Sequence, residues 1–341
     1  MKIKILCTLG PASNNARVLG QLDERGVDLF RINLSHTSLE ALDDTIGHVR
    51  EHSDTPICLD TEGAQVRCGP MLPDVVLNQG DEVCLTAETV MGNASRLTLW
   101  PETVFEALSV GSVVGIDFDG VRLRVVRIEG DHPVAVVVKG GRVRSNKGAT
   151  VDPAIKLPAL SEKDVAATRI GAAHGLTDYA LSFASSAEDV AQLRSLAPPD
   201  AHVIAKIESR AGVQNMDSII PAADAILIDR GDLSRDVPLE LIPYYQKAII
   251  RRANRWHRPV YVATNLLESM VTGKLPTIAE ANDIATTLLD GVHGLVLAAE
   301  TAIGVDPAGS VDILRRAMWA FERADGGYFL EEDRPRLRAV G

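Results

Sequence analysis

HVIAKIES (202–209) is the first of four similar runs in the second half of the chain; the others are AILIDRGD (225–232), PVYVATNLLESM (259–270) and GLVLAAET (294–301). Each run is an apolar stretch that ends abruptly at polar or charged residues. Apolar runs that alternate with amphipathic helical segments are typical of a parallel sheet. Polar side chains at the carboxyl ends of several such strands indicate the active-site end of a (β/α)8 barrel. Charged caps on the following helices are the simpler alternative.

Strand-like runs recur along the whole chain of 341 residues. We place eight of them near 3–9, 28–34, 56–60, 178–183, 202–207, 225–230, 259–264 and 294–299, with a last helix near 308–325. Residues of about 70–156 break this rhythm with valine-rich alternating runs and regular glycines, which are typical of an all-β domain. Ser161, followed three residues later by Asp164, predicts a helix start where the rhythm resumes.

These runs predict an α/β fold, namely a (β/α)8 TIM barrel with an inserted all-β lid domain. The expected boundaries are 1–69 and 157–326 for the barrel, 70–156 for the β-barrel lid and 327–341 for a polar C-terminal tail. A domain inserted at the catalytic end of a barrel is well placed to close over the site.

Composition narrows the class of protein. The chain is 46% hydrophobic and 24% charged, which suits a globular protein with a sizeable core. No apolar run is long enough to cross a bilayer, and no signal-peptide pattern opens the chain, so we expect a cytoplasmic protein with no membrane partner. A net charge of −11 argues against nucleic acid as a partner. Four cysteines without metal-ligand spacing indicate free thiols.

Oxygen-bearing side chains at the strand ends predict two cation sites. Glu208 and Asp232 follow neighbouring strands, and two carboxylates are a usual way for proteins to hold Mg²⁺. A second set follows the second and third strands and suits a hard monovalent or divalent cation: Asn33, Ser35, Asp60 and Thr61.

Three cations are expected near these carboxylates. Lys206 lies two residues before Glu208 and therefore on the same face of its strand. Arg31 and Arg67 would join it around a small anionic substrate, and such charge clamps are what phosphoryl transfer requires. An ion-pair network that merely seals the barrel top is the alternative.

Eight motifs then resemble one known family. KILCTLGPAS, RINLSH, LDTEGAQVRCG, LPALSEKD, AKIESRAGVQNMDSI, DRGDLS, VATNLLESM and AAETAIG match the strand ends of pyruvate kinases in order and spacing. VGSVVGIDFDGVRL and GGRVRSNKGATV are similar to the family's lid domain. The resemblance covers nearly the whole chain and implies a glycolytic transferase that moves a phosphoryl group between phosphoenolpyruvate and ADP through a Mg²⁺-stabilised enolate.

The resemblance also implies residue roles. Lys206 would stabilise the transferring phosphoryl group and the enolate, Arg31 and Arg67 would contact the phosphoryl group, and Thr264 would lie near C3 of the enolate. Glu208 and Asp232 would bind Mg²⁺ or Mn²⁺.

Further roles concern K⁺, the substrate and the nucleotide. The K⁺ ligands would be Asn33, Ser35, Asp60 and Thr61. The backbone of Arg230, Gly231 and Asp232 would hold the substrate carboxylate at a helix N-terminus, with Asp229 beside it. His36 and Pro11 would face the nucleotide, ADP or ATP.

The chain also departs from the family pattern. It ends just after the eighth barrel helix, so the resemblance implies that the family's C-terminal domain is lacking and favours a homodimer over the family's tetramer. Asp229 replaces a small apolar residue close to the substrate. Ala298, Ala299 and Ile303 replace a serine-and-lysine pattern near the nucleotide. Glu62 and Gln65 stand where lysine and glutamate are usual.

Three functions therefore remain open. The leading one is phosphoryl transfer between phosphoenolpyruvate and ADP, or a close variant. The second is a re-purposed Mg²⁺-dependent lyase, aldolase or transferase that acts on a pyruvate-like enolate without nucleotide. The third is a non-catalytic regulator on a retained fold. We expect Asp229 either to turn toward Arg230 or Arg235, or to face a changed substrate with a raised pKa.

Overall fold

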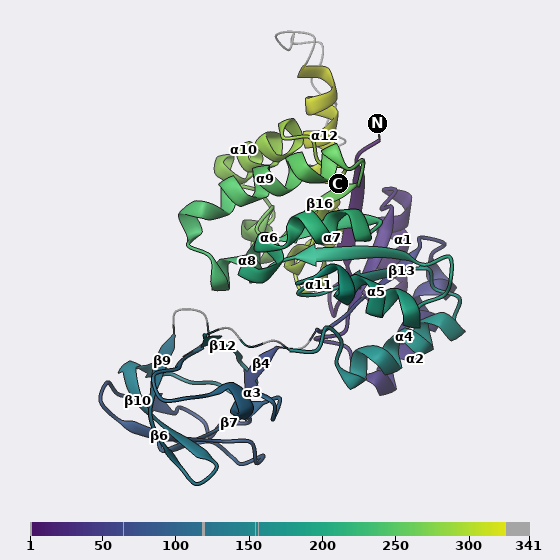
Figure 1. Cartoon of the computed structure of the whole chain (residues 1–341). Helices are drawn as coiled ribbons and strands as arrows, with labels where there is room; N and C mark the ends of the chain where they lie inside the picture. Colours follow the sequence, from purple (N-terminus) through teal and green to yellow (C-terminus); the bar gives the residue numbers. More distant parts are fainter. Residues whose placement is uncertain (1, 64, 118–119, 154, 156, 325–341) are drawn as a thin grey trace.

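The computed structural model describes residues 2–324 except 64, 118–119, 154 and 156 (Figure 1). The polar tail predicted at 327–341 therefore lies outside the described residues.

Eight strands form a closed barrel in which every neighbouring pair is parallel. They follow one another around the barrel in chain order, and the last returns to the first. The strands are β1 Lys4–Thr8, β2 Leu29–Asn33, β3 Ile57–Asp60, β13 Asp178–Leu181, β14 His202–Ile207, β15 Ala225–Asp229, β16 Val260–Ala263 and β17 Gly294–Leu297. This arrangement confirms the predicted TIM barrel.

Helices surround this barrel in the large body of Figure 1. The α-helices are α1 Ala16–Glu24, α2 Leu39–His52, α4 Glu162–Ala173, α5 Ala187–Leu196, α6 Arg210–Gln214, α7 Met216–Ala222, α8 Arg230–Asp236, α9 Ile242–Arg255, α10 Ile278–Leu289, α11 Ala299–Ala302 and α12 Pro307–Ala324. Two 3₁₀ turns, η1 Leu239–Leu241 and η2 Glu268–Val271, complete them. Ser161 and Asp164 form a capping box at the start of α4, as predicted. No described helix is long and apolar enough to span a membrane.

A second closed barrel is inserted between β3 and α4, and Figure 1 shows it as a separate body. Its elements, together with a small two-stranded sheet of β5 and β11, are β4 Val66–Cys68, β5 Val76–Leu77, β6 Glu82–Thr86, β7 Arg96–Trp100, α3 Val104–Ala107, β8 Val113–Ile116, β9 Val121–Glu129, β10 His132–Lys139, β11 Gly141–Arg142 and β12 Gly148–Asp152. The barrel's strands pair antiparallel except for β6 with β7. The inserted all-β lid domain is thus confirmed as a fold element.

The domain boundaries themselves remain a proposal: 1–69 and 157–326 for the large barrel and 70–156 for the insert. Strand β4 lies before residue 70, yet it pairs with β7 and β12 of the second barrel. Its hydrogen bonds therefore place these three residues with the insert.

The interior of the large barrel positions the site. The part further from the carboxyl ends of the strands is an apolar core, to which every strand contributes a buried side chain: Leu6, Leu29, Cys58, Ala180, Ile204, Leu227, Tyr261 and Val296. Side chains alternate along a strand, so the residue two positions further on also faces inward. On β16 and β17 this position is Ala263 or Ala298. On the other six strands it carries a polar side chain, and these form what we call the polar layer: Thr8, Arg31, Asp60, Ser182, Lys206 and Asp229. All six are buried.

Candidate active site

Asp60 is the shared carboxylate of the polar layer. Its carboxylate lies 3.4 Å from Arg31 Nη1 and 3.3 Å from Lys206 Nζ. Ser182 Oγ donates to it at 3.3 Å. One fully buried carboxylate thus compensates two cations that come from the neighbouring strand β2 and from β14.

Lys206 is held from several sides. Its Nζ lies 3.1 Å from Glu208 Oε2 and donates to Ser182 Oγ at 3.0 Å. Burial acts to lower the pKa of Lys206, but Asp60, Glu208 and Asp229 outweigh burial and raise it above its ordinary value. The side chain is therefore a permanent cation at neutral pH, suited to stabilise negative charge rather than to accept a proton.

Three carboxylates gather beside Lys206. Glu208, Asp229 and Asp232 each place an oxygen within 4.8 Å of the others. Burial raises the pKa of Glu208 against the opposing charge of Lys206, and Asp232 and Asp229 raise it further. Burial and Asp229 likewise raise the pKa of Asp232, against Lys206 and Arg235. The cluster is therefore short of positive charge.

One buried oxygen of this cluster, Glu208 Oε2, lacks a hydrogen bond from the described residues. Glu208 Oε1 accepts from the backbone N–H of Phe183 at 2.8 Å. Glu208 Oε2 is close to Lys206 Nζ, but the contact is not aligned as a hydrogen bond, and no described group donates to this buried oxygen. Carboxylate oxygens are the donors that Mg²⁺ and Mn²⁺ prefer, and a bound cation would satisfy the orphan oxygen. The residues present fit a divalent cation.

Asp229 caps the start of α8 from inside the barrel. Its Oδ1 accepts from Asp232 N at 3.4 Å and from Thr264 Oγ1 at 3.2 Å. Of the two alternatives expected for Asp229, the turn toward Arg230 or Arg235 is not the one that its described contacts show. Arg230 Nη1 instead pairs with Asp283 at 2.7 Å, and Arg235 Nη1 pairs with Asp232 at 3.0 Å. Asp229 ends β15 and is engaged by Thr264 and the start of α8, whereas each of the two arginines has a carboxylate partner of its own.

Thr264 joins the expected substrate residues. It adopts a left-handed backbone conformation with φ of 67°. Its Oγ1 accepts from Gly231 N at 2.8 Å, and its carbonyl accepts from Arg230 Nε at 3.1 Å. The backbone N–H groups of Gly231 and Asp232, expected to face a substrate carboxylate, are thus already engaged by Thr264 and Asp229.

The residues expected to bind K⁺ lie at the ends of two adjacent strands. Asn33 and Asp60 are register partners in β2 and β3. Asn33 Oδ1 accepts from Ser35 N at 2.9 Å, and Thr61 Oγ1 accepts from Ser182 N at 2.9 Å. The structure thus brings these oxygen-bearing groups to one edge, although Asp60 also serves Arg31 and Lys206.

Other expected site residues lie outside the polar layer. Arg67 belongs to β4 and lies 3.6 Å from Glu62, which also lies 3.4 Å from Lys163. Arg67 Nη1 donates to the carbonyl of Asn146. Arg67 is therefore tied to a carboxylate on the segment that joins the two barrels.

The residues expected near the nucleotide lie in the segments that follow β1 and β2. Pro11 and His36 are both exposed there. Both segments open at the carboxyl ends of the strands, the end that carries the polar layer.

Two members of the polar layer did not emerge from the sequence. Thr8 Oγ1 accepts from Arg31 Nε at 3.0 Å, and Ser182 Oγ contacts both Asp60 and Lys206. Each lies two residues beyond an inward-facing apolar residue, Leu6 or Ala180. Strict alternation along the first and fourth strands was the signal that could have found them.

Glu300, the charged residue near the end of the fourth run of the sequence, has a structural role. Its carboxylate is buried and accepts from Leu267 N at 3.0 Å and Ala298 N at 2.8 Å. These bonds fix the loops after β16 and β17.

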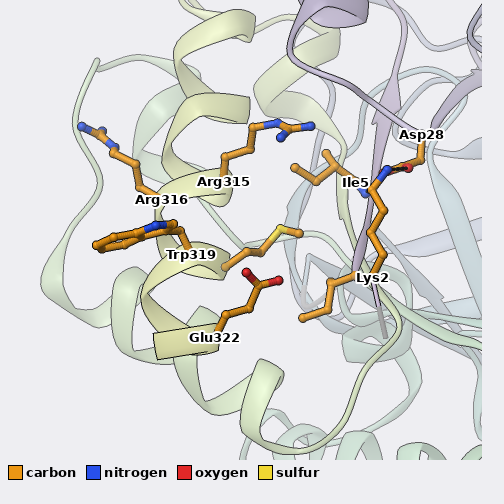
Figure 2. A pocket seen from close by; sticks show the side chains of 9 residues that line it. Lys2, Ile5, Asp28, Arg315, Arg316, Trp319 and Glu322 are labelled. Atoms are coloured by element: carbon orange, nitrogen blue, oxygen red, sulfur yellow. Dashed lines mark hydrogen bonds and ion pairs between the residues drawn. The ribbon is translucent and has the colours of Figure 1, made fainter. Parts of the chain in front are cut away.

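A cavity of about 430 Å³ lies at the other end of the large barrel (Figure 2). Lys2, Asp28, Arg315, Trp319 and Glu322 are among its lining residues, and Lys2 pairs with Asp28 at 2.7 Å. These residues come from the amino ends of β1 and β2 and from α12. Active sites of such barrels lie at the carboxyl ends of the strands, so we place the candidate site at the polar layer instead.

Comparisons with known proteins complete the description. Residues 1–311 match the family "Pyruvate kinase, barrel domain". A pyruvate kinase of Methylorubrum extorquens is 36% identical over 329 residues, which cover 94% of this chain and 69% of that protein. A pyruvate kinase of Geobacillus stearothermophilus is 34% identical over 339 residues, covering 95% and 57%. One from Chlamydia trachomatis is 35% identical over 334 residues, covering 94% and 69%. The chain thus spans 57–69% of the length of these relatives.

Proposed function

The chain belongs to the pyruvate kinase family, and from this premise we propose that it transfers a phosphoryl group between phosphoenolpyruvate and ADP, or a close variant of that pair. In this reaction the bond from phosphorus to the enol oxygen breaks, a bond from phosphorus to a β-phosphate oxygen of ADP forms, and the enolate takes a proton at C3 to give pyruvate. The observation that carries the proposal is Lys206, a buried cation beside a carboxylate cluster with an orphan oxygen.

The chain's own residues would bind and neutralise the reacting groups. Lys206 and Arg31, fixed by Asp60, hold positive charge where the phosphoryl group and the enolate oxygen would lie. Arg67 would add a third cation from the second barrel. The hydroxyl of Thr264, between Gly231 N and Asp229 Oδ1, is the group we assign to proton delivery at C3.

Cations and the nucleotide have separate places in this proposal. Glu208 and Asp232 would hold Mg²⁺ or Mn²⁺, which would offset charge on the enolate and phosphoryl oxygens. Asn33, Ser35, Asp60 and Thr61 would hold K⁺ as a second cation. Pro11 and His36 would lie beside ADP or ATP.

A coupled assay tests the proposal. Purified protein with phosphoenolpyruvate, ADP, Mg²⁺ and K⁺ should form pyruvate and ATP, followed by NADH oxidation with lactate dehydrogenase. Omission of Mg²⁺ should abolish the signal. Solvent deuterium exchange into pyruvate, with and without nucleotide, separates the alternatives: exchange without transfer indicates enolate chemistry of another kind, and neither activity indicates a non-catalytic protein.

Asp229 favours a second candidate function, a Mg²⁺-dependent lyase, aldolase or transferase that acts on a pyruvate-like enolate without nucleotide. Its carboxylate faces the lumen at the start of α8, where a family substrate would place its own carboxylate. At ~4 Å two such charges repel by about 4 kcal/mol at an effective dielectric constant of 20.

Replacing Asp229 with alanine decides between the two functions. Both proteins are assayed at saturating Mg²⁺. If phosphoryl transfer to ADP rises about tenfold or more in Asp229→Ala, the natural reaction is the second candidate. If the wild type is already a competent kinase and the variant is no faster, the second candidate fails.

A further inference from the structure

We propose that Asp229 is a third carboxylate ligand of the divalent cation, beside Glu208 and Asp232. The proposal rests on the proposed function only in placing a divalent cation at Glu208 and Asp232. It adds a ligand at a position where pyruvate kinases usually carry a small apolar residue.

The backbone fixes Asp229 in the cluster. Asp229 is the last residue of β15, two residues beyond the lumen residue Leu227, and only 4% of it is exposed. Its main chain is held in the barrel sheet, in register with Ala263 of β16. Its distance to the other two carboxylates is within 4.8 Å, the spacing of groups that share one ion.

Hydrogen bonds orient the Asp229 carboxylate. Both bonds that the structure gives it, from Asp232 N and from Thr264 Oγ1, fall on Oδ1. Oδ2 is therefore the oxygen that would coordinate a cation. A carboxylate held by outer partners in this way is typical of a metal ligand.

Glu208 supplies an independent observation. Glu208 belongs to the same cluster and is 1% exposed. Its Oε2 receives no hydrogen bond from the described residues, although Lys206 Nζ lies 3.1 Å away. Lys206 offsets part of the desolvation cost of this oxygen, and a directly coordinated cation would supply the bond that the oxygen lacks.

The charges around the cluster do not balance. Four carboxylates meet three cations there: Asp60, Glu208, Asp229 and Asp232 against Arg31, Lys206 and Arg235. Arg235 is 33% exposed and compensates weakly. A cation bound by three carboxylates would remove the excess negative charge, and affinity for hard cations rises with the number of charged ligands.

Mn²⁺ binding tests the assignment without reference to catalysis. Isothermal titration and the electron paramagnetic resonance of free Mn²⁺ would be measured on the wild type, Asp229→Asn and Asp229→Ala. Asparagine keeps the helix cap but removes the charge, so it separates ligation from folding. We expect both variants to raise the Kd for Mn²⁺ about tenfold or more, and to reduce the rise in Tm that Mn²⁺ produces in the wild type.

Two further variants make the result specific. Asp236→Asn removes the same charge near α8 but outside the cluster, and it should leave the Kd for Mn²⁺ within twofold of the wild type. If Asp236→Asn weakens Mn²⁺ binding as much as Asp229→Asn does, Asp229 acts through long-range electrostatics and is not a ligand. Asp232→Asn reports on the parent site. If Asp232→Asn weakens Mn²⁺ binding and Asp229→Asn does not, this inference alone is overturned. If neither variant changes Mn²⁺ binding, the metal site of the proposed function is overturned as well.

Discussion

Burial and neighbouring negative charge have opposite effects on the free energy of the charged Lys206 side chain. Removing the ammonium group from water costs free energy, and Asp60 and Glu208 offset this cost at 3.3 and 3.1 Å. A buried pair of this kind contributes little net stability, but loss of one partner leaves an uncompensated charge. The arrangement is therefore better explained by transition-state stabilisation than by folding.

Lys206→Met should lower kcat for phosphoryl transfer by about two to three decades, because one fixed charge at the reacting oxygens is worth roughly 3–4 kcal/mol. The coupled assay measures it, and circular dichroism checks that the fold persists. Lys247→Met is the control, since Lys247 pairs with Asp290 on the outer helices at 2.6 Å. A Lys206 variant within a few-fold of the wild type would show that this lysine is only an ion-pair partner.

Much of the site at the residue scale could be predicted from strand ends alone. Lys206, Glu208 and Asp232 stand out because charges interrupt apolar runs, and the structure brings them together. Thr8 and Ser182 could not be recognised in this way, since small hydroxyl residues are common in any loop. The ion-pair partners of Arg230 and Arg235 could not be predicted from the sequence, because they depend on the direction in which α8 leaves the barrel.

At the scale of elements, α10 shows how a helix start is fixed. Glu280 accepts from Ser269 N, Ser269 Oγ and Thr277 N, and Thr277 caps the helix in return. Burial acts to raise the pKa of Glu280, but the hydrogen bonds from Ser269 and Thr277 outweigh it and lower the pKa below its ordinary value. The same carboxylate therefore ties η2 to α10.

Glu280→Ala should lower the free energy of unfolding by about 1–2 kcal/mol at pH 7, because the capping box and the bonds to Ser269 are lost. The folded-state pKa is lowered, so this stabilisation is present above the unfolded pKa of about 4.3 and is lost as pH falls through the folded pKa. Urea denaturation at pH 7 and at a series of pH values from 4 downward measures both effects. Glu240→Gln is the control, since Glu240 is an exposed carboxylate in η1. If the loss of unfolding free energy in Glu280→Ala stays constant across this pH range, the assignment is contradicted.

Element boundaries could be predicted closely where an apolar run ends at a charge. The strand predicted at 202–207 has those same bounds, and the one predicted at 225–230 ends at Asp229. The position of β4 could not be predicted, because three residues carry no periodicity. Their pairing with β7 and β12 comes from residues far along the chain.

At the scale of the whole molecule, one exposed side of α10 lacks charge. Ile278 is 90% exposed and Leu289 is 73% exposed, and eleven residues place them three turns apart on one side of the helix. Between them the exposed residues on this side are Ala281, Asn282 and Ala285. Figure 1 shows α10 on the outside of the large body, beside α9 and α12. Contiguous apolar surfaces are typical of protein–protein contacts, and this uncharged side is where we expect one.

We therefore expect the chain to form a homodimer through α10, with a mass by light scattering of twice the chain mass. Ala285→Arg places a guanidinium group at the centre of the uncharged face, where a two-fold contact would bring it close to its own copy. Such a variant should elute as a monomer at micromolar concentration and keep its helical content. Ala191→Arg makes the same change on the exposed side of α5 and should remain dimeric. A monomeric wild type would exclude the dimer. An Ala285→Arg protein that stays dimeric would place the contact elsewhere, because a charge introduced into a packed interface cannot be buried without a partner.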